Sequence, residues 1–600
     1  MSQKNDPNDL PLPDAAAFSQ NLMKVASQSQ KLVAEFLERQ SQEGAGPQDP
    51  LNVGDAFLEL TQRMLSDPQK LAQAQIGLWQ DYLNLWQQGA QRMLGQPAEN
   101  MAEPSPGDRR FKDPAWQENQ VFDFIKQSYL LTSRWLMDTV HEVDGLDARS
   151  AKKVDFYTRQ FIDAMSPSNF VLTNPEVLRT TLEQNGENLV RGLDHMLDDL
   201  ERGKGKLAIK MTDLDAFQVG ENVATTPGKV VWQTELMQLI QYTPTTEKVH
   251  RRPLVIFPPW INKFYILDLR PDNSFIKWAV DHGLTVFVAS WVNPDASLAD
   301  KTFEDYMHEG VLAALDGVEA ATGEKDVTAI GYCLGGTLLA TSLAYMKAIG
   351  DERVKAATFF TALVDFADPG ELEIFIDDEQ LKNLEDRMDE QGGVLDGSAM
   401  ATTFNMLRAN DLIWSFVINN YLLGKEPFPF DLLYWNTDST RMPRAMHLYY
   451  LRNMYQENLL SQPGGLSFGD VSIDLGQVDI PIYILSTKED HIAPWKATYV
   501  ATQLYKGPVQ FTLAGSGHIA GVVNPPSAGK YGFWTNKENP PAPDDWFAGA
   551  TQQPGSWWEN WLAWVAKQSG RKVAARQPGS DKAPALEDAP GSYVKVRSDT

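Results

Sequence analysis

Short apolar runs alternate with amphipathic segments along the chain from residue 209 onward. The runs are rich in β-branched and aromatic residues and occupy residues 254–259, 285–291, 327–333, 356–366, 480–490 and 509–518. Continuous apolar strands that alternate with helices are typical of a mostly parallel sheet with helices on both faces. This alternation predicts an α/β domain over residues 209–570.

The preceding part of the chain has a different pattern. Between residues 51 and 208, apolar residues recur at three- and four-residue spacing, which predicts an all-helical N-terminal domain. Residues 1–50 combine a polar start, an amphipathic helix near 18–38 and a Gly/Pro/Gln linker, which predicts a mobile arm. A chain of 600 residues is too long for one hydrophobic core, so several domains are expected.

One interval interrupts the alternation of strands and helices. Residues 368–475 are rich in aromatic residues and methionine, and they predict helices and loops rather than another strand–helix repeat. Because an insertion between two sheet strands often covers an active site, we expect a cap here. The final residues, 571–600, contain few large apolar side chains and predict a loosely docked or disordered tail.

The composition argues against several classes of protein. A formal net charge of −26 does not suit a nucleic-acid-binding protein, which needs clustered Lys and Arg. No apolar stretch reaches the length of about 18 residues that a transmembrane helix needs, and the polar start does not resemble a secretory signal. The single cysteine, Cys333, allows neither an internal disulfide nor a Cys-rich metal site. We therefore expect a cytoplasmic protein without a bound metal.

This cysteine lies in the most informative motif of the chain. Residues 331–335, GYCLG, match the G-x-S-x-G nucleophile elbow, with sulfur in place of the serine oxygen. An apolar run precedes the motif and a helical segment follows it, as a sharp strand-to-helix turn requires. A lone cysteine is more often a small buried hydrophobe, but glycines on both sides favour a nucleophile, because the turn brings the flanking positions into close approach.

A nucleophile at such an elbow needs an acid and a histidine that follow it in the chain. Asp490 and His518 follow Cys333 in that order, each at the carboxyl end of a predicted strand, where open α/β sheets place their sites. Glu489 competes with Asp490 for the role of the acid. His491 is the rival base, although it is too close in sequence to be oriented by Asp490. We predict a triad of Cys333, His518 and Asp490, with His491 in a supporting role.

An oxyanion hole in this type of site uses two backbone N–H groups. The first belongs to the residue after the nucleophile, Leu334, and the second lies in the loop after the run at 254–259. The prolines in that loop have no N–H, which leaves Trp260 or Ile261 as the second donor. We favour Ile261.

Four segments of the chain resemble signature segments of the polyhydroxyalkanoate synthases. They are GYCLGG, PPWINKFYILDL, STKEDHIAPW and GSGHIAGVVNPP. The resemblance runs from about residue 111 to about residue 567, and the long helical N-terminal region is similar to that of the class I enzymes. It implies an α/β-hydrolase core with a helical cap insertion, preceded by an all-helical N-terminal domain. It also implies that Cys333 is the acylated thiol, His518 the base and Asp490 the acid.

The resemblance implies the chemistry and the partners as well. Class I enzymes polymerise short-chain (R)-3-hydroxyacyl-CoA, chiefly 3-hydroxybutyryl-CoA, into a polyester and release CoA, through a cysteine thioester and without a cofactor. They act as homodimers in the cytoplasm, on the surface of polyester granules that also carry other proteins. In this chain Arg408, His491 and Trp435 are candidate substrate-binding residues. Either His518 or Asp490 could activate the 3-hydroxyl group during elongation.

Two other functions are compatible with the same residues. An acyl-CoA thioesterase or lipase-like hydrolase would use an identical triad and transfer the acyl group to water. A non-catalytic granule-coat protein would use the amphipathic N-terminal helices to bind a surface, although an intact Cys–Asp–His set argues against it. The sequence leaves the preferred acyl length open.

Overall fold

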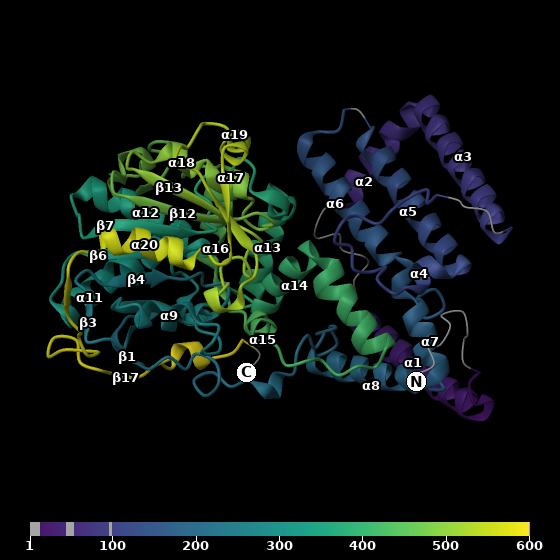
Figure 1. The fold of residues 1–600 in the computed structure, drawn as a ribbon, viewed down its shortest axis with the longest axis horizontal. Helices are drawn as coiled ribbons and strands as arrows, with labels where there is room; N and C mark the ends of the chain where they lie inside the picture. Colours follow the sequence, from purple (N-terminus) through teal and green to yellow (C-terminus); the bar gives the residue numbers. More distant parts are fainter. Residues whose placement is uncertain (1–11, 44–52, 95–98, 144, 599–600) are drawn as a thin grey trace. The chain divides into compact units, whose positions relative to one another are not determined.

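The computed structural model describes residues 12–43, 53–94, 99–143 and 145–598, and it divides the chain into two units. The first, the helical unit, comprises Met1–Asp213 and Phe404–Phe428. The second, the sheet unit, comprises Leu214–Thr403 and Pro429–Thr600. Figure 1 draws the helices and strands of both units. Each unit has hydrophobic clusters of its own, as expected of parts that fold around separate cores.

An eleven-stranded sheet forms the centre of the sheet unit, in the order β15-β14-β13-β12-β7-β6-β4-β5-β2-β1-β17. Its six central strands are parallel to one another and coincide with the six apolar runs of the sequence. They are β4 (Leu254–Phe257), β5 (Val286–Trp291), β6 (Val327–Tyr332), β7 (Val354–Phe360), β12 (Ile482–Thr487) and β13 (Val509–Ala514). The predicted α/β fold with a mostly parallel sheet is confirmed.

Antiparallel strands extend this sheet at both edges, and the sequence pattern did not predict them. β14 (Gly532–Thr535) and β15 (Thr551–Pro554) follow β13 at one edge. β2 (Met237–Tyr242), β1 (Gly228–Gln233) and β17 (Glu587–Asp588) follow β5 at the other. β14, β15 and β17 are short and only partly buried, so they lack the continuous apolar run that reveals a buried strand.

Helices cover both faces of the sheet (Figure 1). Each face has its own hydrophobic cluster. One cluster includes α9 (Phe275–Asp281) and α20 (Trp558–Gln568), and the other includes α11 (Ala313–Thr322), α12 (Leu334–Ile349) and α16 (Arg444–Tyr450). The other helices of this unit are α10 (Phe303–Asp305), α13 (Asp378–Glu390), α15 (Asp431–Thr437), α17 (Trp495–Tyr499), α18 (Ala501–Leu504) and α19 (Pro543–Ala548). The sheet is therefore the middle of three layers, and only its strand ends are open to carry a site.

The interval 368–475, predicted as one cap, is divided between the two units. Residues Phe404–Phe428 belong to the helical unit, and the remainder belongs to the sheet unit. The interval contains helices such as α14 (Gly397–Leu407) and short π-helical segments, as its aromatic composition predicts. Its two parts therefore have different surroundings.

In the described part of the helical unit, seven helices of nine residues or more precede residue 203, together with short turns. They are α1 (Ala15–Glu43), α2 (Val53–Ser66), α3 (Pro68–Met93), α5 (Gln120–His141), α6 (Ala148–Ala164), α7 (Pro175–Glu183) and α8 (Glu187–Arg202). The segment Phe404–Phe428 packs on α8, because the Tyr421 hydroxyl donates to Asp199 at 2.6 Å and Asn188 donates to the Leu422 carbonyl at 2.7 Å. Gly192 lets this segment approach, since a Cβ there would lie 1.8 Å from the Tyr421 carbonyl oxygen.

The helix predicted near residues 18–38 is present within α1. The mobility predicted for the arm falls partly on residues 1–11 and 44–50, which lie outside the described residues. Among the helices that the structure describes, none is both long and apolar enough to cross a membrane.

The C-terminal tail is integrated into the sheet unit, so the expectation of a loosely docked or disordered tail is wrong. β16 (Lys572–Ala574) pairs with β3 (Lys248–His250), and β17 completes one edge of the main sheet. Ala583 and Val594 are buried in the two hydrophobic clusters. The tail uses backbone pairing, side-chain hydrogen bonds and small apolar contacts, which a search for large apolar residues does not detect.

Candidate active site

Cys333 occupies the turn between β6 and α12. Its backbone adopts φ 50° and ψ −122°, a region that residues other than glycine rarely enter. The Cys333 N–H donates to the Phe360 carbonyl on β7 at 2.9 Å, and the Cys333 carbonyl accepts from the Gly336 N–H at 2.8 Å. The chain is therefore strained at the predicted nucleophile, and the neighbouring strand and helix hold the strain in place.

The glycines around Cys333 have no room for a side chain. A Cβ on Gly331 would lie 2.5 Å from Gly336 Cα, and a Cβ on Gly335 would lie 2.2 Å from the Phe257 carbonyl oxygen. Real Cβ atoms essentially never come closer than 3.0 Å to such groups. The close approach predicted for the turn is confirmed, and the contact at Phe257 shows that the end of β4 lies directly beside it.

Asp490 and His518 are bonded to each other at the carboxyl ends of two neighbouring parallel strands, β12 and β13. His518 Nδ1 lies 2.8 Å from Asp490 Oδ2, and both side chains are buried. The other carboxylate oxygen of Asp490 accepts from the Ile492 and Ala493 N–H groups at 2.9 and 2.8 Å. Because carboxylate oxygens accept hydrogen bonds, Nδ1 is the donor in this contact, and Nε2 is left to interact with the nucleophile.

Opposing effects act on the His518 imidazole. Burial lowers its pKa, whereas the charges of Asp490 and Cys333 and the hydrogen bonds to both residues raise it. The pKa that results is about 10, above the ordinary value of 6.5. The hydrogen bond to Cys333 means that the structure brings together all three residues of the predicted triad.

The two neighbours that competed for these roles have other surroundings. Glu489 is exposed, and its backbone N–H donates to the Ser516 carbonyl at 2.9 Å. His491 is half-buried beside Asp490, but the imidazole that bonds the carboxylate is that of His518. The geometry therefore favours Asp490 and His518 over both rivals.

The two predicted oxyanion donors lie on adjacent backbone segments. Leu334 is the first residue of α12, where helical N–H groups have no acceptor within the helix. Ile261 lies in the loop after β4, and its carbonyl accepts from the Thr440 N–H at 2.9 Å. In the part of the chain that the structure describes, neither the Leu334 nor the Ile261 N–H donates to a protein acceptor. Both amides are therefore available to bind an oxyanion.

Sequence reasoning missed a tyrosine inside the motif itself. Tyr332 is buried, and its hydroxyl donates to the His518 carbonyl at 3.2 Å. Burial and the charges of Cys333 and Asp490 raise the pKa of Tyr332 well above 10, so the hydroxyl remains a donor. Tyr332 thus ties β6 to the turn that carries His518. Its position beside the cysteine was the only signal in the sequence.

Two further tyrosines lie within electrostatic range of Cys333. Tyr450 ends α16, and Tyr455 lies in the π-helix η9 (Leu451–Gln456). Burial, followed by neighbouring groups that include Cys333, raises the pKa of both hydroxyls. Both rings pack on Phe366, with centroid distances of 6.0 and 4.9 Å. The aromatic composition of the interval 368–475 was the only signal, and it did not single out these two residues.

The three candidate substrate-binding residues have separate surroundings. Arg408 belongs to the helical unit, where its guanidinium pairs with Asp411. Trp435 is buried in α15, and its Nε1 donates to the Lys263 carbonyl at 2.7 Å. His491 lies beside the triad carboxylate. Their roles in substrate binding remain predictions, and Trp435 is placed to support the loop after β4.

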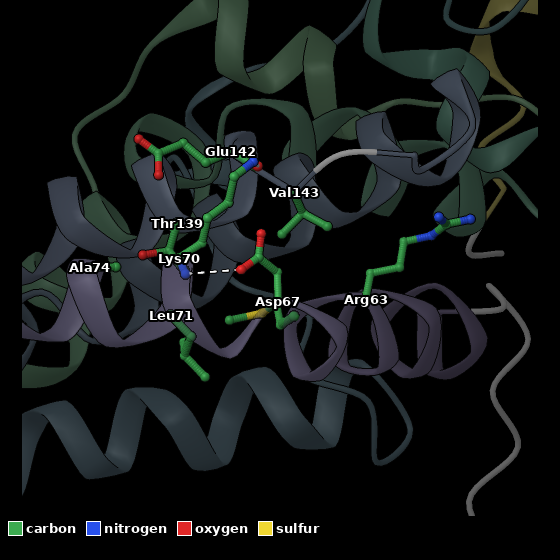
Figure 2. A pocket seen from close by; sticks show the side chains of 9 residues that line it. Arg63, Asp67, Lys70, Leu71, Ala74, Thr139, Glu142 and Val143 are labelled. Carbon is green, nitrogen blue, oxygen red and sulfur yellow. Dashed lines mark hydrogen bonds between the residues drawn. The ribbon is translucent and has the colours of Figure 1, made fainter.

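A hollow of about 300 Å³ in the helical unit contains none of the predicted site residues. Figure 2 shows its lining, in which Asp67 caps α3 by accepting from the Lys70 N–H at 3.1 Å. Lys70 Nζ donates to the Glu142 carbonyl at the end of α5, at 3.4 Å. The polar groups of this hollow therefore form hydrogen bonds with backbone groups at the ends of α3 and α5.

Among the described residues of both units, no group of three or more His, Cys, Asp or Glu side chains is arranged to hold a metal ion.

The strand order, the elbow turn and the chain order of the cysteine, aspartate and histidine define a protein of the α/β-hydrolase fold. Two family models match the chain. One is described as "Poly-beta-hydroxybutyrate polymerase (PhaC) N-terminus" and matches residues 107–279, and the other is described as "alpha/beta hydrolase fold" and matches residues 268–525.

Characterised relatives span nearly the whole chain. The poly(3-hydroxyalkanoate) polymerase of Methylorubrum extorquens is 52% identical over 89% of this chain and 88% of its own. The polymerase subunit PhaC of Rhizobium meliloti is 46% identical over 98% of this chain and 96% of its own, and that of Cupriavidus necator is 43% identical over 88% and 90%. The chain belongs to the family of poly(3-hydroxyalkanoate) polymerases, which are acyltransferases.

Proposed function

We propose that this polymerase acts on short-chain (R)-3-hydroxyacyl-CoA, chiefly 3-hydroxybutyryl-CoA, through a covalent thioester on Cys333. The observation that carries the proposal is the Asp490–His518 hydrogen bond beside a cysteine at a strained elbow. The match to a family model described as a poly-beta-hydroxybutyrate polymerase supports the short-chain substrate.

In the acylation step, His518 Nε2 accepts the proton of the Cys333 thiol, since the thiolate is the nucleophile. Because the pKa of His518 is raised to about 10, the imidazole keeps this proton at neutral pH, and the pair rests as thiolate and imidazolium before substrate binds. Cys333 Sγ bonds to the thioester carbon, and the Leu334 and Ile261 amides bind the oxyanion. When the carbon–sulfur bond to CoA breaks, His518 returns the proton and CoA leaves as the thiol.

In the elongation step, the 3-hydroxyl oxygen of the next unit attacks an acyl thioester. An ester bond forms, the thioester bond breaks, and the hydroxyl proton passes to a base and then to the departing sulfur. Both Asp490 oxygens already accept hydrogen bonds from protein groups, and the side chain has no exposed surface. We therefore assign the base of this step to His518 as well.

We also propose, from the family resemblance, that the enzyme acts as a homodimer in the cytoplasm on the polyester surface. The exposed side chains of Ile76, Trp79, Leu83 and Trp86 recur at three- and four-residue spacing on α3, and such an apolar stripe suits a hydrophobic surface. Sedimentation of the purified protein alone measures its oligomeric state. Sedimentation with polyester particles measures its binding to their surface.

The decisive experiment supplies purified enzyme with (R)-3-hydroxybutyryl-CoA and follows both CoA release and the fate of the acyl group. Release of CoA with formation of insoluble polyester, together with an acylated Cys333 trapped by acid quench, is expected. Free 3-hydroxybutyrate as the sole product would identify a thioesterase with the same triad. Comparison with longer 3-hydroxyacyl-CoA substrates measures the chain-length preference, and a higher kcat/KM for them would contradict the short-chain assignment.

A further inference from the structure

The loop that carries Ile261 is bonded, residue by residue, to a segment more than 170 positions later in the chain. We name residues 260–263 the oxyanion loop and residues 435–440 the clasp segment. The contacts are Thr440 Oγ1 to the Trp260 carbonyl, Thr440 N–H to the Ile261 carbonyl at 2.9 Å, Asn262 Nδ2 to the Trp435 carbonyl at 3.3 Å, Trp435 Nε1 to the Lys263 carbonyl at 2.7 Å, and Lys263 Nζ to Asp438 at 2.6 Å. Every residue of the oxyanion loop therefore has a partner in the clasp segment.

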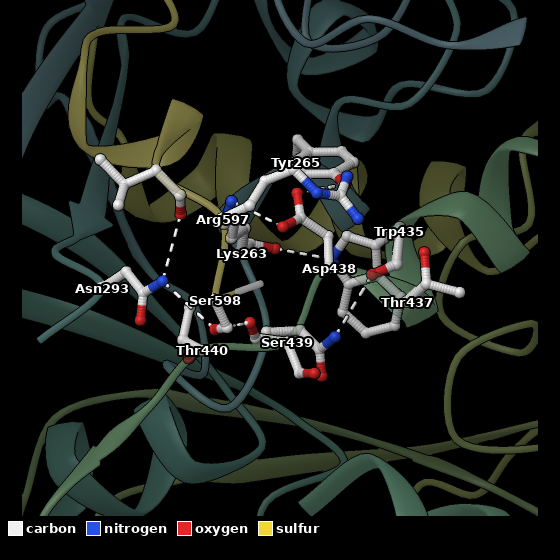
Figure 3. Close-up of polar contacts among 12 residues, drawn as sticks. Lys263, Tyr265, Asn293, Trp435, Thr437, Asp438, Ser439, Thr440, Arg597 and Ser598 are labelled. Carbon is white, nitrogen blue, oxygen red and sulfur yellow. Dashed lines mark hydrogen bonds and ion pairs between the residues drawn. The ribbon is translucent and has the colours of Figure 1, made fainter. Parts of the chain in front are cut away.

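One of these contacts is a buried ion pair at the end of the oxyanion loop (Figure 3). The side chains of Lys263 and Asp438 are only 2% and 1% exposed. The Tyr265 hydroxyl donates to the second carboxylate oxygen at 2.9 Å, and burial together with Asp438 keeps the pKa of this hydroxyl well above 10. Removing either partner would leave an uncompensated buried charge, so the pair fixes the end of the loop in one arrangement.

The C-terminal residues hold the clasp segment from its other side. The Ser598 hydroxyl donates to the Ser439 carbonyl at 2.6 Å, and Asn293, just after β5, donates from Nδ2 to the Ser598 oxygen at 3.2 Å. Figure 3 shows Arg597 and Ser598 reaching the same cluster, and the Arg597 guanidinium lies 5.7 Å from the ring centroid of Tyr434. The tail therefore completes a chain of contacts that leads to the oxyanion loop.

We propose that Asp438, Lys263 and Ser598 are positioning residues, which hold the Ile261 amide where the oxyanion develops. The inference rests on the proposed acylation of Cys333. A backbone N–H has no rotamers of its own, so only the loop can set its distance to the oxyanion, and a small displacement weakens a preorganised hydrogen bond. These residues act through the loop, and they do so only while the ion pair and the Thr440 bonds are intact.

The test is Asp438→Asn, which keeps the size of the side chain and an acceptor for Tyr265 but removes the charge that pairs with Lys263. We expect kcat for CoA release from (R)-3-hydroxybutyryl-CoA to fall about 10- to 100-fold, with KM within about two-fold of wild type. Thr440→Val is the milder second variant, because it removes the side-chain bonds to the loop and leaves the ion pair. We expect it to lower kcat by about 3- to 10-fold.

A second measurement distinguishes a displaced oxyanion loop from a disturbance of Cys333 and His518. Cys333 is the single cysteine of the chain, so its alkylation by iodoacetamide measures the reactivity of the thiol without any need for the oxyanion amides. We expect both variants to be alkylated at the wild-type rate. The matched control is Asp123→Asn, which disrupts a similarly buried pair with Lys126 in the helical unit, where the two groups are 2.9 Å apart. Turnover per folded molecule should stay at the wild-type value in this control.

Several outcomes would overturn the inference. Wild-type turnover in Thr440→Val and in any folded Asp438→Asn would show that the clasp segment does not set the loop. A fall in alkylation equal to the fall in turnover would place the damage at Cys333 and His518, and a rise in KM at constant kcat would indicate substrate binding instead. Cys333→Ala is assayed in parallel, because CoA release by that variant would refute the acylation and not the clasp.

Discussion

The turn that carries Cys333 and the loop that carries Ile261 lie side by side at the carboxyl edge of one sheet, yet different contacts hold them. The turn is held through the glycines of its own short motif, because Gly331 and Gly336 allow β6 and α12 to approach each other within six residues, and Gly335 allows the turn to pack against the end of β4. The oxyanion loop depends on the clasp segment and on the C-terminal residues. A short motif can therefore specify the position of the proposed nucleophile, whereas the amide proposed to bind the oxyanion lies in a loop that is bonded to distant parts of the chain.

The largest expected effect comes from removing the nucleophile while leaving both regions in place. Cys333→Ala should lower CoA release by about 10³-fold or more, because the covalent route is lost and only binding contributions remain. The melting temperature should stay at or above the wild-type value, since the strained residue is small in both proteins. The assay follows CoA release and thermal unfolding together, and retained release would show that another group attacks the thioester.

The next largest effect is expected at the Asp490–His518 pair, which belongs neither to the turn that carries Cys333 nor to the oxyanion loop. Asp490→Asn should lower CoA release by about 10³-fold, because the imidazole loses its orienting carboxylate. In the wild type, the raised pKa of His518 contributes stability that is fully present below pH 6.5 and is lost as the pH rises through about 10. The variant retains the burial that lowers this pKa and loses the contributions of Asp490 that raise it, so the decline in its free energy of unfolding between about pH 7 and pH 10 should become smaller.

Denaturant unfolding across this pH range measures the decline. His518→Gln serves as its control, because it removes the titrating group and should lack the same slope. An unchanged slope in Asp490→Asn would mean that another group causes it.

Gly335 lies where the turn that carries Cys333 packs against the end of β4, and a substitution there tests whether the turn and the oxyanion loop are coupled through their backbones. In Gly335→Ala the new methyl group would lie 2.2 Å from the Phe257 carbonyl oxygen and 2.6 Å from that of Pro258. We expect a loss of about 2–3 kcal/mol in the free energy of unfolding and about 10-fold lower turnover. Gly77→Ala, on α3 with nothing within 4 Å of the new methyl group, should instead gain about 0.5–1 kcal/mol. Equal stability of the two variants would show that the backbone at Gly335 and the end of β4 can move apart to make room for a methyl group.

The smallest effect is expected from the hydrogen bond that joins Tyr332, beside Cys333, to the His518 carbonyl. Tyr332→Phe removes the hydrogen bond to the His518 carbonyl, and it should lower the free energy of unfolding by about 1 kcal/mol and turnover by about 3-fold. Tyr483→Phe loses a similar bond to Asn560, 3.0 Å long, at a buried position of β12. It should show the same stability loss with wild-type turnover. A matching fall in turnover in both variants would mean that Tyr332 has no specific role at the site.

The sequence predicted the six parallel strands and the positions of the triad because each depends on local information. A strand buried on both faces must be apolar throughout, and a residue at its carboxyl end must reach the edge where the site lies. Asp490 and His518 were predicted in this way, and the structure shows a hydrogen bond between their side chains. The short, partly buried edge strands β14, β15 and β17 and the packed tail were missed, because backbone pairing leaves little trace in the side-chain pattern.

By itself, the sequence determined the α/β core, the strained turn at Cys333 and the chain order of the acid and the histidine. Only the tertiary structure decided that His518, and not His491, bonds Asp490, and that Phe404–Phe428 packs with the N-terminal helices. It alone joined Lys263 to Asp438 and brought Ser598 to the clasp segment. The physical reason is the distance along the chain over which each effect acts. Periodicity and turn chemistry act over a few residues, whereas the buried charge pair and the contacts of the clasp segment join residues more than 150 positions apart.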